Sequence, residues 1–162
     1  MGTRANSFYF EDFSIGQRFG SGSHTVDAEE IKEFARTWDP QPFHLDEETA
    51  SRTIFGGLAA SGWHTAAITM GLAVRGEFRP VNGILGLGVE DLRWPAAVRP
   101  GDRLRVMSEV VEVRPSISRP DYGVVKIRNT TTNQEDVPVQ VLTAILLVAR
   151  RPEQLRGSGP TD

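Results

Sequence analysis

The sequence predicts an α+β domain in which an antiparallel sheet wraps around one buried central helix. The first observation is a segment at residues 63–74 that is apolar on nearly every side, as expected of a helix enclosed by other elements. The second is a series of segments rich in Val, Ile and Leu with partial alternation, which is typical of strands. The third is that turn-forming residues separate those segments. The predicted strands cover residues 84–94, 102–114, 122–133 and 137–149.

In the first half of the chain, residues 26–38 are predicted to form a helix. Apolar residues recur there with helical spacing, and Asp27 can cap the N-terminus. Pro40 and Pro42 end this helix and favour extended backbone before them.

Two further helix starts are indicated by polar caps. Asp46 is expected to cap a short helix at residues 45–55, and Ser61 is expected to cap the central helix with Gly62 in its first turn. Additional strands are expected around Phe8–Phe10 and Arg18–Thr25.

The composition sets limits on the class of protein. A chain of 162 residues predicts one domain, over residues 1–150, and a polar tail at 151–162 that we expect to be disordered. The net charge of −3 argues against a nucleic-acid partner, and the lack of cysteine excludes disulfides and thiolate chemistry. No signal-peptide pattern is found, and the apolar run at 141–149 is too short to cross a bilayer. We expect a cytoplasmic protein with no membrane partner.

One short segment fixes an acid and an imidazole close together. Asp39 and His44 lie five residues apart on backbone that Pro40 and Pro42 restrict, so ordering both groups costs less entropy on folding. Rigid placement matters for catalysis, because a misplacement of ~1 Å can cost ~100-fold in rate.

Several segments together resemble a known family. They read "DPQPFHLDEETA", "FGGLAASGWHT", "YFEDFSIGQRF" and "LRWPAAVRPGDRL", within residues 8–150. They resemble the MaoC-like dehydratases, the (R)-specific enoyl-CoA hydratase group, whose fold is the hot-dog fold. The resemblance implies hydration of a trans-2-enoyl thioester of coenzyme A, or the reverse dehydration, within fatty acid metabolism. It also implies no metal and no organic cofactor besides the coenzyme A of the substrate, and dimers whose sheets join.

The resemblance also assigns residues. The catalytic aspartate and histidine correspond to Asp39 and His44, and the main-chain donor of the oxyanion hole corresponds to the amide of Gly62. Many relatives have histidine immediately before that glycine, where this chain has Ser61. We expect the neighbouring residues to contact the substrate, and these are Pro42, Phe43, Ser61, Trp63 and His64.

The residue types suit this reaction. An imidazole and a carboxylate that flank one water can deprotonate it for attack at C3 and return a proton to C2. We expect His44 to be the main base, because histidine titrates near neutral pH. We expect Asp39 to hold the water and, if burial raises its pKa, to deliver the proton. The Gly62 amide, at a helix N-terminus, can stabilise negative charge on the thioester oxygen.

Other interpretations stay open at this point. Asp39 can be a turn residue, His44 a core histidine and Gly62 a site of close packing. A Ser61–His64 nucleophile pair lacks a strand–turn motif around it. A hot-dog thioesterase and a non-catalytic acyl-CoA-binding protein are the alternative functions. Four arginines either meet the phosphates of coenzyme A or lie on a solvated strand face, and these are Arg93, Arg99, Arg103 and Arg105.

Overall fold

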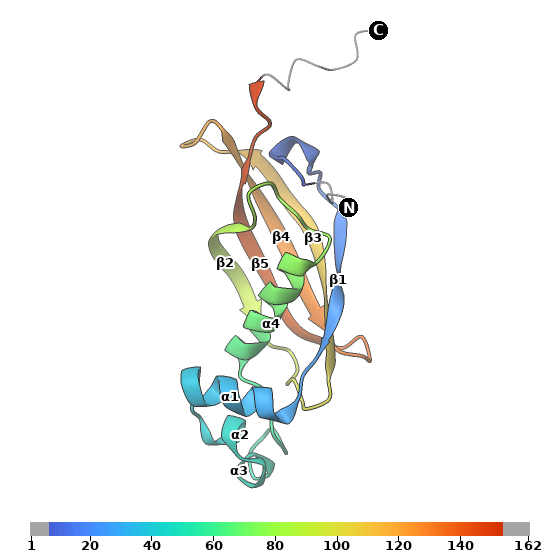
Figure 1. The fold of residues 1–162 in the computed structure, drawn as a ribbon, viewed down its shortest axis with the longest axis vertical. Coiled ribbons are helices and arrows are strands. Elements are labelled where there is room, and N and C mark those ends of the chain that lie inside the picture. Colours follow the sequence, from blue (N-terminus) through green and yellow to red (C-terminus); the bar gives the residue numbers. More distant parts are fainter. Residues whose placement is uncertain (1–6, 154–162) are drawn as a thin grey trace, which may run out of the picture.

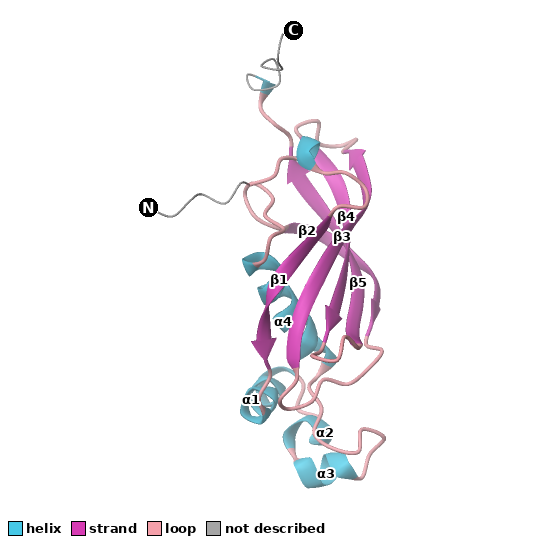
Figure 2. Cartoon of the chain, turned by 90° about the vertical axis from the view of Figure 1, so that its right-hand side faces the viewer, coloured by secondary structure: helices cyan, strands magenta, loops and turns pink. Residues whose placement is uncertain are grey.

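The computed structural model describes residues 7–153, which form ten helices and strands. In chain order these are η1 (Phe10–Asp12), β1 (Arg18–Thr25), α1 (Ala28–Trp38), α2 (Pro42–Leu45), α3 (Glu47–Ser51), α4 (Gly62–Arg75), β2 (Leu85–Arg93), β3 (Arg103–Pro115), β4 (Tyr122–Thr132) and β5 (Pro138–Ala149). The five strands form one antiparallel sheet in the order β1-β3-β4-β5-β2. Helix α4 lies against one face of this twisted sheet, and α1, α2 and α3 gather beyond one end of it (Figures 1 and 2). The predicted α+β architecture is therefore confirmed.

The four predicted strands of the second half are confirmed, but they do not form one continuous meander. β3, β4 and β5 pair consecutively, whereas β2 pairs with β5 at the far edge of the sheet. The connection from β2 to β3 passes the start of α4, where the Val98 carbonyl accepts from the N–H of Ala60 (2.9 Å). Alternation in a sequence reports which face of a strand is buried, and it does not identify the neighbouring strand.

The strand predicted around Phe8–Phe10 is wrong. Phe8 makes one isolated bridge to Pro80, and the chain then turns into η1. The Asp12 carboxylate accepts from the N–H of Tyr9 (2.8 Å) and closes this turn, so a local side-chain bond replaces the strand pairing. The strand predicted at Arg18–Thr25 is confirmed as β1.

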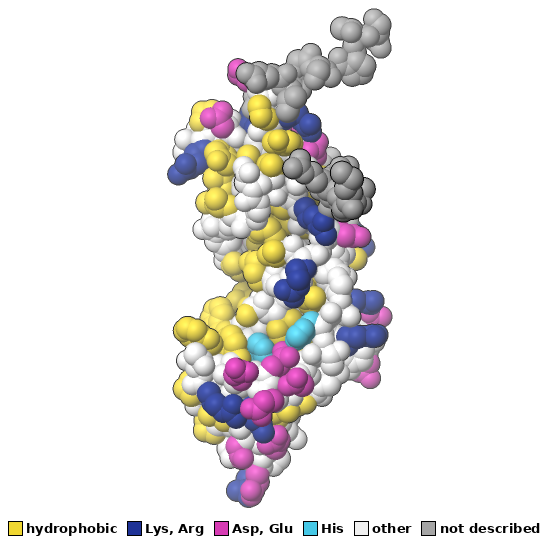
Figure 3. Space-filling view, in the orientation of Figure 1, with side chains coloured by type: hydrophobic (Ala, Val, Ile, Leu, Met, Phe, Trp, Pro, Cys, Tyr) yellow, Lys and Arg dark blue, Asp and Glu magenta, His cyan; other side chains and the backbone are white. Residues whose placement is uncertain are grey.

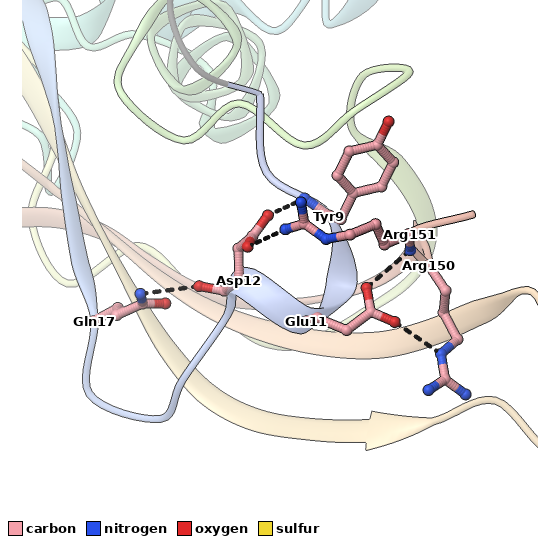
Figure 4. A network of polar contacts seen from close by, with 6 residues as sticks. All are labelled: Tyr9, Glu11, Asp12, Gln17, Arg150 and Arg151. Carbon is pink, nitrogen blue, oxygen red and sulfur yellow. Dashed lines mark hydrogen bonds and ion pairs between the residues drawn. The ribbon is translucent and has the colours of Figure 1, made fainter. Parts of the chain in front are cut away.

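A polar network joins η1 to the end of β5 (Figure 4). Glu11 accepts from Nε of Arg150 (3.1 Å) and from the N–H of Arg151 (2.8 Å), while Arg151 also pairs with Asp12. Arg151 belongs to the tail that was predicted to be disordered over residues 151–162. Residues 154–162 lie outside the part of the chain that the structure describes.

The helices that precede the site follow their predicted caps. Asp27 accepts from the N–H of Glu30 at the start of α1, and Asp46 accepts from the N–H of Thr49 at the start of α3. α3 is shorter than the predicted helix at residues 45–55, and an additional helical turn, α2, begins at Pro42. Proline suits the first position of a helix, so Pro42 starts a turn here. Within residues 7–153, none of the helices combines the length and apolar character needed to cross a lipid bilayer.

Helix α4 is buried on one side only, which corrects the prediction of full enclosure. Leu72 and Ala73 face the sheet and are buried, whereas Trp63, Met70 and Val74 are more than half exposed. The neighbouring strand β2 is a sheet edge, exposed along nearly its whole length. The apolar surface of α4 therefore continues onto an open edge, and Figure 3 shows hydrophobic side chains along this face.

The core consists of two clusters along the length of the sheet. The first is aromatic, with Phe13, Phe19 and Phe78 packed at ring distances of 5.4–6.1 Å. The second joins the start of α1, the segment that leads into α4 and the β2–β3 connection; its buried members are Val26, Ile31, Leu58, Ala60, Leu72, Val98, Leu104, Val106 and Val139. The second cluster therefore fixes the segments that surround the start of α4.

Candidate active site

A cleft of about 380 Å³ opens at the N-terminal end of α4. It lies where α1, α2, the start of α4 and the β2–β3 connection meet. Its lining residues are Asp39, Gln41, Phe43, His44, Phe55, Ala60, Gly62, Trp63, Thr65, Trp94, Ala96, Ala97 and Val98. The two residues of the predicted dyad and the predicted oxyanion donor therefore face one common space.

Asp39 is held at the C-terminus of α1 by polar neighbours. Its Oδ2 accepts from the hydroxyl of Ser61 (2.6 Å), and its Oδ1 accepts from the side-chain amide of Gln41 (2.7 Å). Burial tends to raise the pKa of Asp39, but these two hydrogen bonds and the nearby His44 ring outweigh it and hold the pKa below its ordinary value. The condition under which Asp39 would deliver a proton, a pKa raised by burial, is therefore not met, and Asp39 is ionised at neutral pH.

His44 is buried, and its two ring nitrogens have different partners. Nδ1 lies 2.6 Å from the carbonyl oxygen of Ala59. A carbonyl oxygen can only accept, so Nδ1 carries a proton in this bond. In the neutral ring, Nε2 is then the unprotonated nitrogen, and it lies 3.4 Å from Oδ2 of Asp39. The ring therefore presents a basic nitrogen beside a carboxylate.

The segment that carries the Ala59 carbonyl is itself anchored. The guanidinium of Arg99 donates to the carbonyl oxygens of Phe55, Gly57 and Leu58. Ala59 is fully buried. The carbonyl that fixes the His44 ring is therefore fixed in turn by the β2–β3 connection.

Gly62 begins α4, and its amide is unused. Ser61 caps the helix by accepting from the N–H of Trp63 (3.2 Å), and no described residue accepts from the N–H of Gly62. A free N–H at a helix N-terminus is a site for negative charge. Gly62 also packs closely, because a Cβ at this position would lie 2.5 Å from the indole of Trp94. Packing against Trp94 therefore requires glycine at this position. The free N–H of the same residue can also bind an anion.

Trp94 is a cleft residue that the sequence prediction missed. Its indole lies over Gly62 and packs edge-on against Trp63, with 5.4 Å between the ring centroids. The sequence carries one signal for it, since a tryptophan directly before Pro95 at the end of a strand marks a rigid turn.

The predicted substrate-binding residues separate into two groups. Phe43 and Trp63 line the cleft. Pro42 starts α2, Ser61 lies fully buried behind Asp39, and His64 points to another part of the molecule; these three do not line the cleft. Ser61 acts on the site through the bond to Asp39, so the pairing of Ser61 with His64 finds no support.

A family model described as the MaoC like domain matches residues 12–133. The chain belongs to the MaoC-like family. A crystal structure of a MaoC-like dehydratase from Rhodospirillum rubrum is similar, with 51% sequence identity and a TM-score of 0.87 over 90% of this chain and 99% of that chain.

Two curated relatives extend this MaoC-like assignment. An uncharacterized protein of Bacillus subtilis, YdeM, is 35% identical over 80% of this chain and 90% of its own length. A 3-hydroxybutyryl-CoA dehydratase of Methylorubrum extorquens is 36% identical over 68% of this chain and 69% of its own length. A Mycobacterium tuberculosis protein with a double hotdog fold is similar in fold, with a TM-score of 0.76 and 22% identity, over 98% of this chain and 48% of that chain. The fold of this MaoC-like chain is accordingly the hot-dog fold.

His64 belongs to a separate cluster on the α1 side of α4. Its ring stacks on Phe34 at 4.7 Å, and its Nε2 lies 3.4 Å from Glu30, which also bonds to His24 (2.9 Å). Histidine and acidic side chains gather on the face shown in Figure 3. Among residues 7–153, no group of three or more His, Cys, Asp or Glu side chains is arranged to hold a metal ion. Burial lowers the pKa of His64, more than the nearby Glu30 raises it.

The four arginines considered for coenzyme A do not form one cluster. Arg93 pairs with Asp91, and Arg105 pairs with Asp136. Arg99 donates to the carbonyls of Phe55, Gly57 and Leu58. Arg103 lies beside Arg105 in a different hollow, next to β1. Arg99 therefore supports the MaoC-like site through the backbone of the segment before α4. Arg93, Arg103 and Arg105 do not line the cleft.

The lowered pKa of His64 predicts a stability that depends on pH. The unfolded chain takes up a proton at the ordinary histidine pKa of 6.5, and folded His64 does so only at lower pH. The contribution of neutral His64 to the free energy of unfolding is therefore complete above pH 6.5. It is lost as the pH falls from 6.5 through the lower pKa of the folded state. Urea unfolding at pH 7.5 and pH 5.5 should show a smaller loss of stability in His64→Gln than in the wild type. An equal loss in both proteins contradicts the assignment.

Proposed function

We propose that this MaoC-like protein catalyses the reversible hydration of a trans-2-enoyl thioester of coenzyme A, or the dehydration of the 3-hydroxyacyl thioester. Membership in the family and a named dehydratase among the relatives support a hydro-lyase activity. The observation that carries the proposal is the dyad geometry. Nε2 of His44 and the Asp39 carboxylate lie 3.4 Å apart in a cleft that also contains the Gly62 amide.

In the direction of hydration, one water in the cleft contacts both Nε2 of His44 and the Asp39 carboxylate from the side of the substrate. Nε2 of His44 takes a proton from this water as its oxygen forms a bond to C3 of the enoyl group. The C2–C3 π electrons move toward C2 and the thioester oxygen, where negative charge develops. The N–H of Gly62 stabilises that charge without reorganising, because it has no other acceptor within the described chain.

The proton then returns to C2 from the imidazolium of His44. The hydrogen bond from Nδ1 to the Ala59 carbonyl stabilises this charged ring. Asp39 keeps its negative charge throughout, because Ser61 and Gln41 donate to it and hold its pKa low. Its task in this proposal is to accept a hydrogen bond from the water and to orient it, and His44 carries the proton in both steps. The proposal uses no metal and no cofactor besides the coenzyme A of the substrate.

The two alternative functions are separated by one assay. A thioesterase would aim its water at the carbonyl carbon, and a binding protein has no use for a positioned acid and base. Incubation with crotonyl-CoA is followed by the loss of enoyl absorbance and by the release of free thiol. Absorbance loss without thiol supports hydration, thiol release supports hydrolysis, and neither change supports binding alone.

Removal of either dyad group should impair turnover far more than binding. We expect Asp39→Asn and His44→Gln each to lower kcat for crotonyl-CoA by about 100-fold or more, because the first loses the carboxylate that orients the water and the second loses the general base, while the shape of the cleft is kept. KM should change little. Asp46→Asn is the matched control, since asparagine caps a helix as well as aspartate and Asp46 lies outside the cleft. Near wild-type kcat in both dyad variants contradicts the assignment.

We propose further that two copies of the chain pair through β2, as a homodimer or as an assembly of such dimers. The edge of β2 leaves backbone groups without a neighbouring strand, and Leu85, Leu87 and Val89 are half exposed on it. Met70 of α4 lines one apolar hollow together with Val89, and both Met70 and Val74 are more than half exposed. A second copy offers the same edge and the same apolar residues. Pairing of the two copies would give the backbone groups hydrogen-bond partners and would bury the apolar side chains.

Charges on this edge should separate the two copies. The double variant Leu85→Lys/Leu87→Lys should sediment as a monomer at a concentration where the wild type sediments as a dimer or larger assembly, because lysines on an edge strand oppose strand pairing. Ile15→Lys is the control, since Ile15 is 70% exposed in the turn before β1, at the opposite edge of the sheet. A monomeric wild type contradicts the pairing.

A further inference from the structure

Helix α4 packs on the sheet through apolar side chains, and these leave its position along its own axis loosely defined. Leu72 belongs to the second core cluster, and Ala73 is buried. Burial of apolar surface is non-directional, so it keeps the helix on the sheet without selecting one position along the axis. Hydrogen bonds have preferred distances and angles, so buried polar contacts can select that position.

Three polar contacts join α4 to the sheet and to the β2–β3 connection. Nε1 of Trp94 donates to Oε1 of Gln140 (2.8 Å), and Nε2 of Gln140 donates to Oγ1 of Thr69 on α4 (3.0 Å). The hydroxyl of Thr69 lies 2.7 Å from that of Thr131. Thr131 on β4 and Gln140 on β5 are paired directly across the two strands. We refer to Trp94, Gln140, Thr69 and Thr131 together as the Gln140 network.

Gln140 connects the other members of this network. An indole N–H can only donate, so the Gln140 atom that faces Trp94 is the amide oxygen, and the amide nitrogen is left to donate to Thr69. Gln140 and Thr131 are fully buried, and Thr69 is nearly so. A buried polar group that loses its partner is costly, so the network favours the one arrangement in which all of these bonds are made.

Gln140 acts on α4 at two places. It bonds directly to Thr69, which lies about two helical turns after Gly62. It also holds the Trp94 indole, which packs against the backbone of Gly62, since a Cβ there would lie 2.5–2.8 Å from three ring atoms. The Trp94 side chain is 41% exposed, so packing encloses only part of it and the bond to Gln140 supplies the remaining restraint.

We propose that Gln140 is a positioning residue that sets where the N–H of Gly62 lies relative to the Asp39–His44 dyad, a claim that rests on the hydratase function proposed above. The dyad belongs to the end of α1 and to α2, whereas Gly62 belongs to α4, so the cleft is assembled from separate elements. Gln140 does not line the cleft and acts through Trp94 and α4. A shift of ~1 Å can cost ~100-fold in rate, so a small movement of α4 weakens the stabilisation of the thioester oxygen.

Gln140→Met tests this role, because methionine is flexible and of similar length but makes neither of the two hydrogen bonds. It should lower kcat for crotonyl-CoA by about tenfold or more and change KM little, because the oxyanion donor is displaced while the cleft stays open. Trp94→Phe should cause a similar loss of kcat, since it keeps a ring over Gly62 and removes the N–H. The double variant should lose no more than the larger single loss, because both changes break the same connection.

Ser108→Ala is the matched control. Ser108 is buried, and its hydroxyl donates to Oδ1 of Asn129 (2.6 Å), but it belongs neither to the Gln140 network nor to the cleft. Its loss should lower the midpoint of thermal unfolding, as Gln140→Met does, and should leave kcat unchanged. The comparison separates the positioning of Gly62 from a general loss of stability.

Three results would overturn the role of Gln140. They are an unchanged kcat in Gln140→Met, an equal loss of kcat in Ser108→Ala, and a double variant whose loss is the product of the two single losses. Should Gln140→Met fail to fold, Trp94→Phe decides in its place by the same measurement of kcat and KM.

A wild type without turnover of crotonyl-CoA and longer enoyl-CoAs refutes the hydratase function instead. The role of Gln140 is then decided by the backbone amide resonance of Gly62 in proton–nitrogen NMR spectra. This resonance should shift in Gln140→Met, or in Trp94→Phe if the former does not fold, and should keep its position in Ser108→Ala. A Gly62 resonance that does not move in the network variant refutes the positioning role.

Discussion

The bond from Nδ1 of His44 to the Ala59 carbonyl determines what the rest of the site can do. It fixes the tautomer of the neutral ring, in which Nε2 is the nitrogen that faces Asp39 without a proton. The Ala59 carbonyl is held in place because the residues before and after it make hydrogen bonds to the β2–β3 connection. Arg99 clamps the preceding carbonyls, and Ala60 bonds to Val98. Residues far from the water therefore decide whether the imidazole can act as a base.

The N-terminus of α4 joins the remaining functions of the site. Ser61 caps the helix and also donates to Asp39, which keeps the carboxylate ionised. The next residue, Gly62, has an amide without an acceptor in the described chain, and its lack of a side chain lets the indole of Trp94 pack against its backbone. One turn of helix thus sets the charge of the acid, the position of an anion donor and the placement of an aromatic side chain. Because these tasks fall on adjacent residues, the helix cap couples folding to the proposed catalysis.

Local sequence patterns predicted most of the helices and strands. They did not predict which elements contact one another across the fold. The spacing of apolar residues located α1 and the later strands, and an apolar segment located α4. The segment around Asp39 and His44 predicted two side chains that do line one cleft. The pairing of β2 with β5 depends on how the sheet curves around α4, which no short segment encodes. The pKa of Asp39 depends on a hydrogen bond from Ser61, which lies 22 residues away, whereas burial alone would raise it. Trp94 enters the site through Gln140 and Gly62, contacts that appear only when the chain is folded.

The most direct test of the proposed chemistry is the protonation of His44 at neutral pH. Nitrogen-15 NMR of the histidine side chains distinguishes a ring protonated at Nδ1 from one protonated at Nε2, and the signal is assigned by its loss in His44→Gln. The bond to Ala59 predicts the Nδ1-protonated neutral form, with Nε2 free to accept a proton from water. A ring protonated at Nε2 would place a donor toward Asp39 and would remove the base on which the proposed chemistry depends.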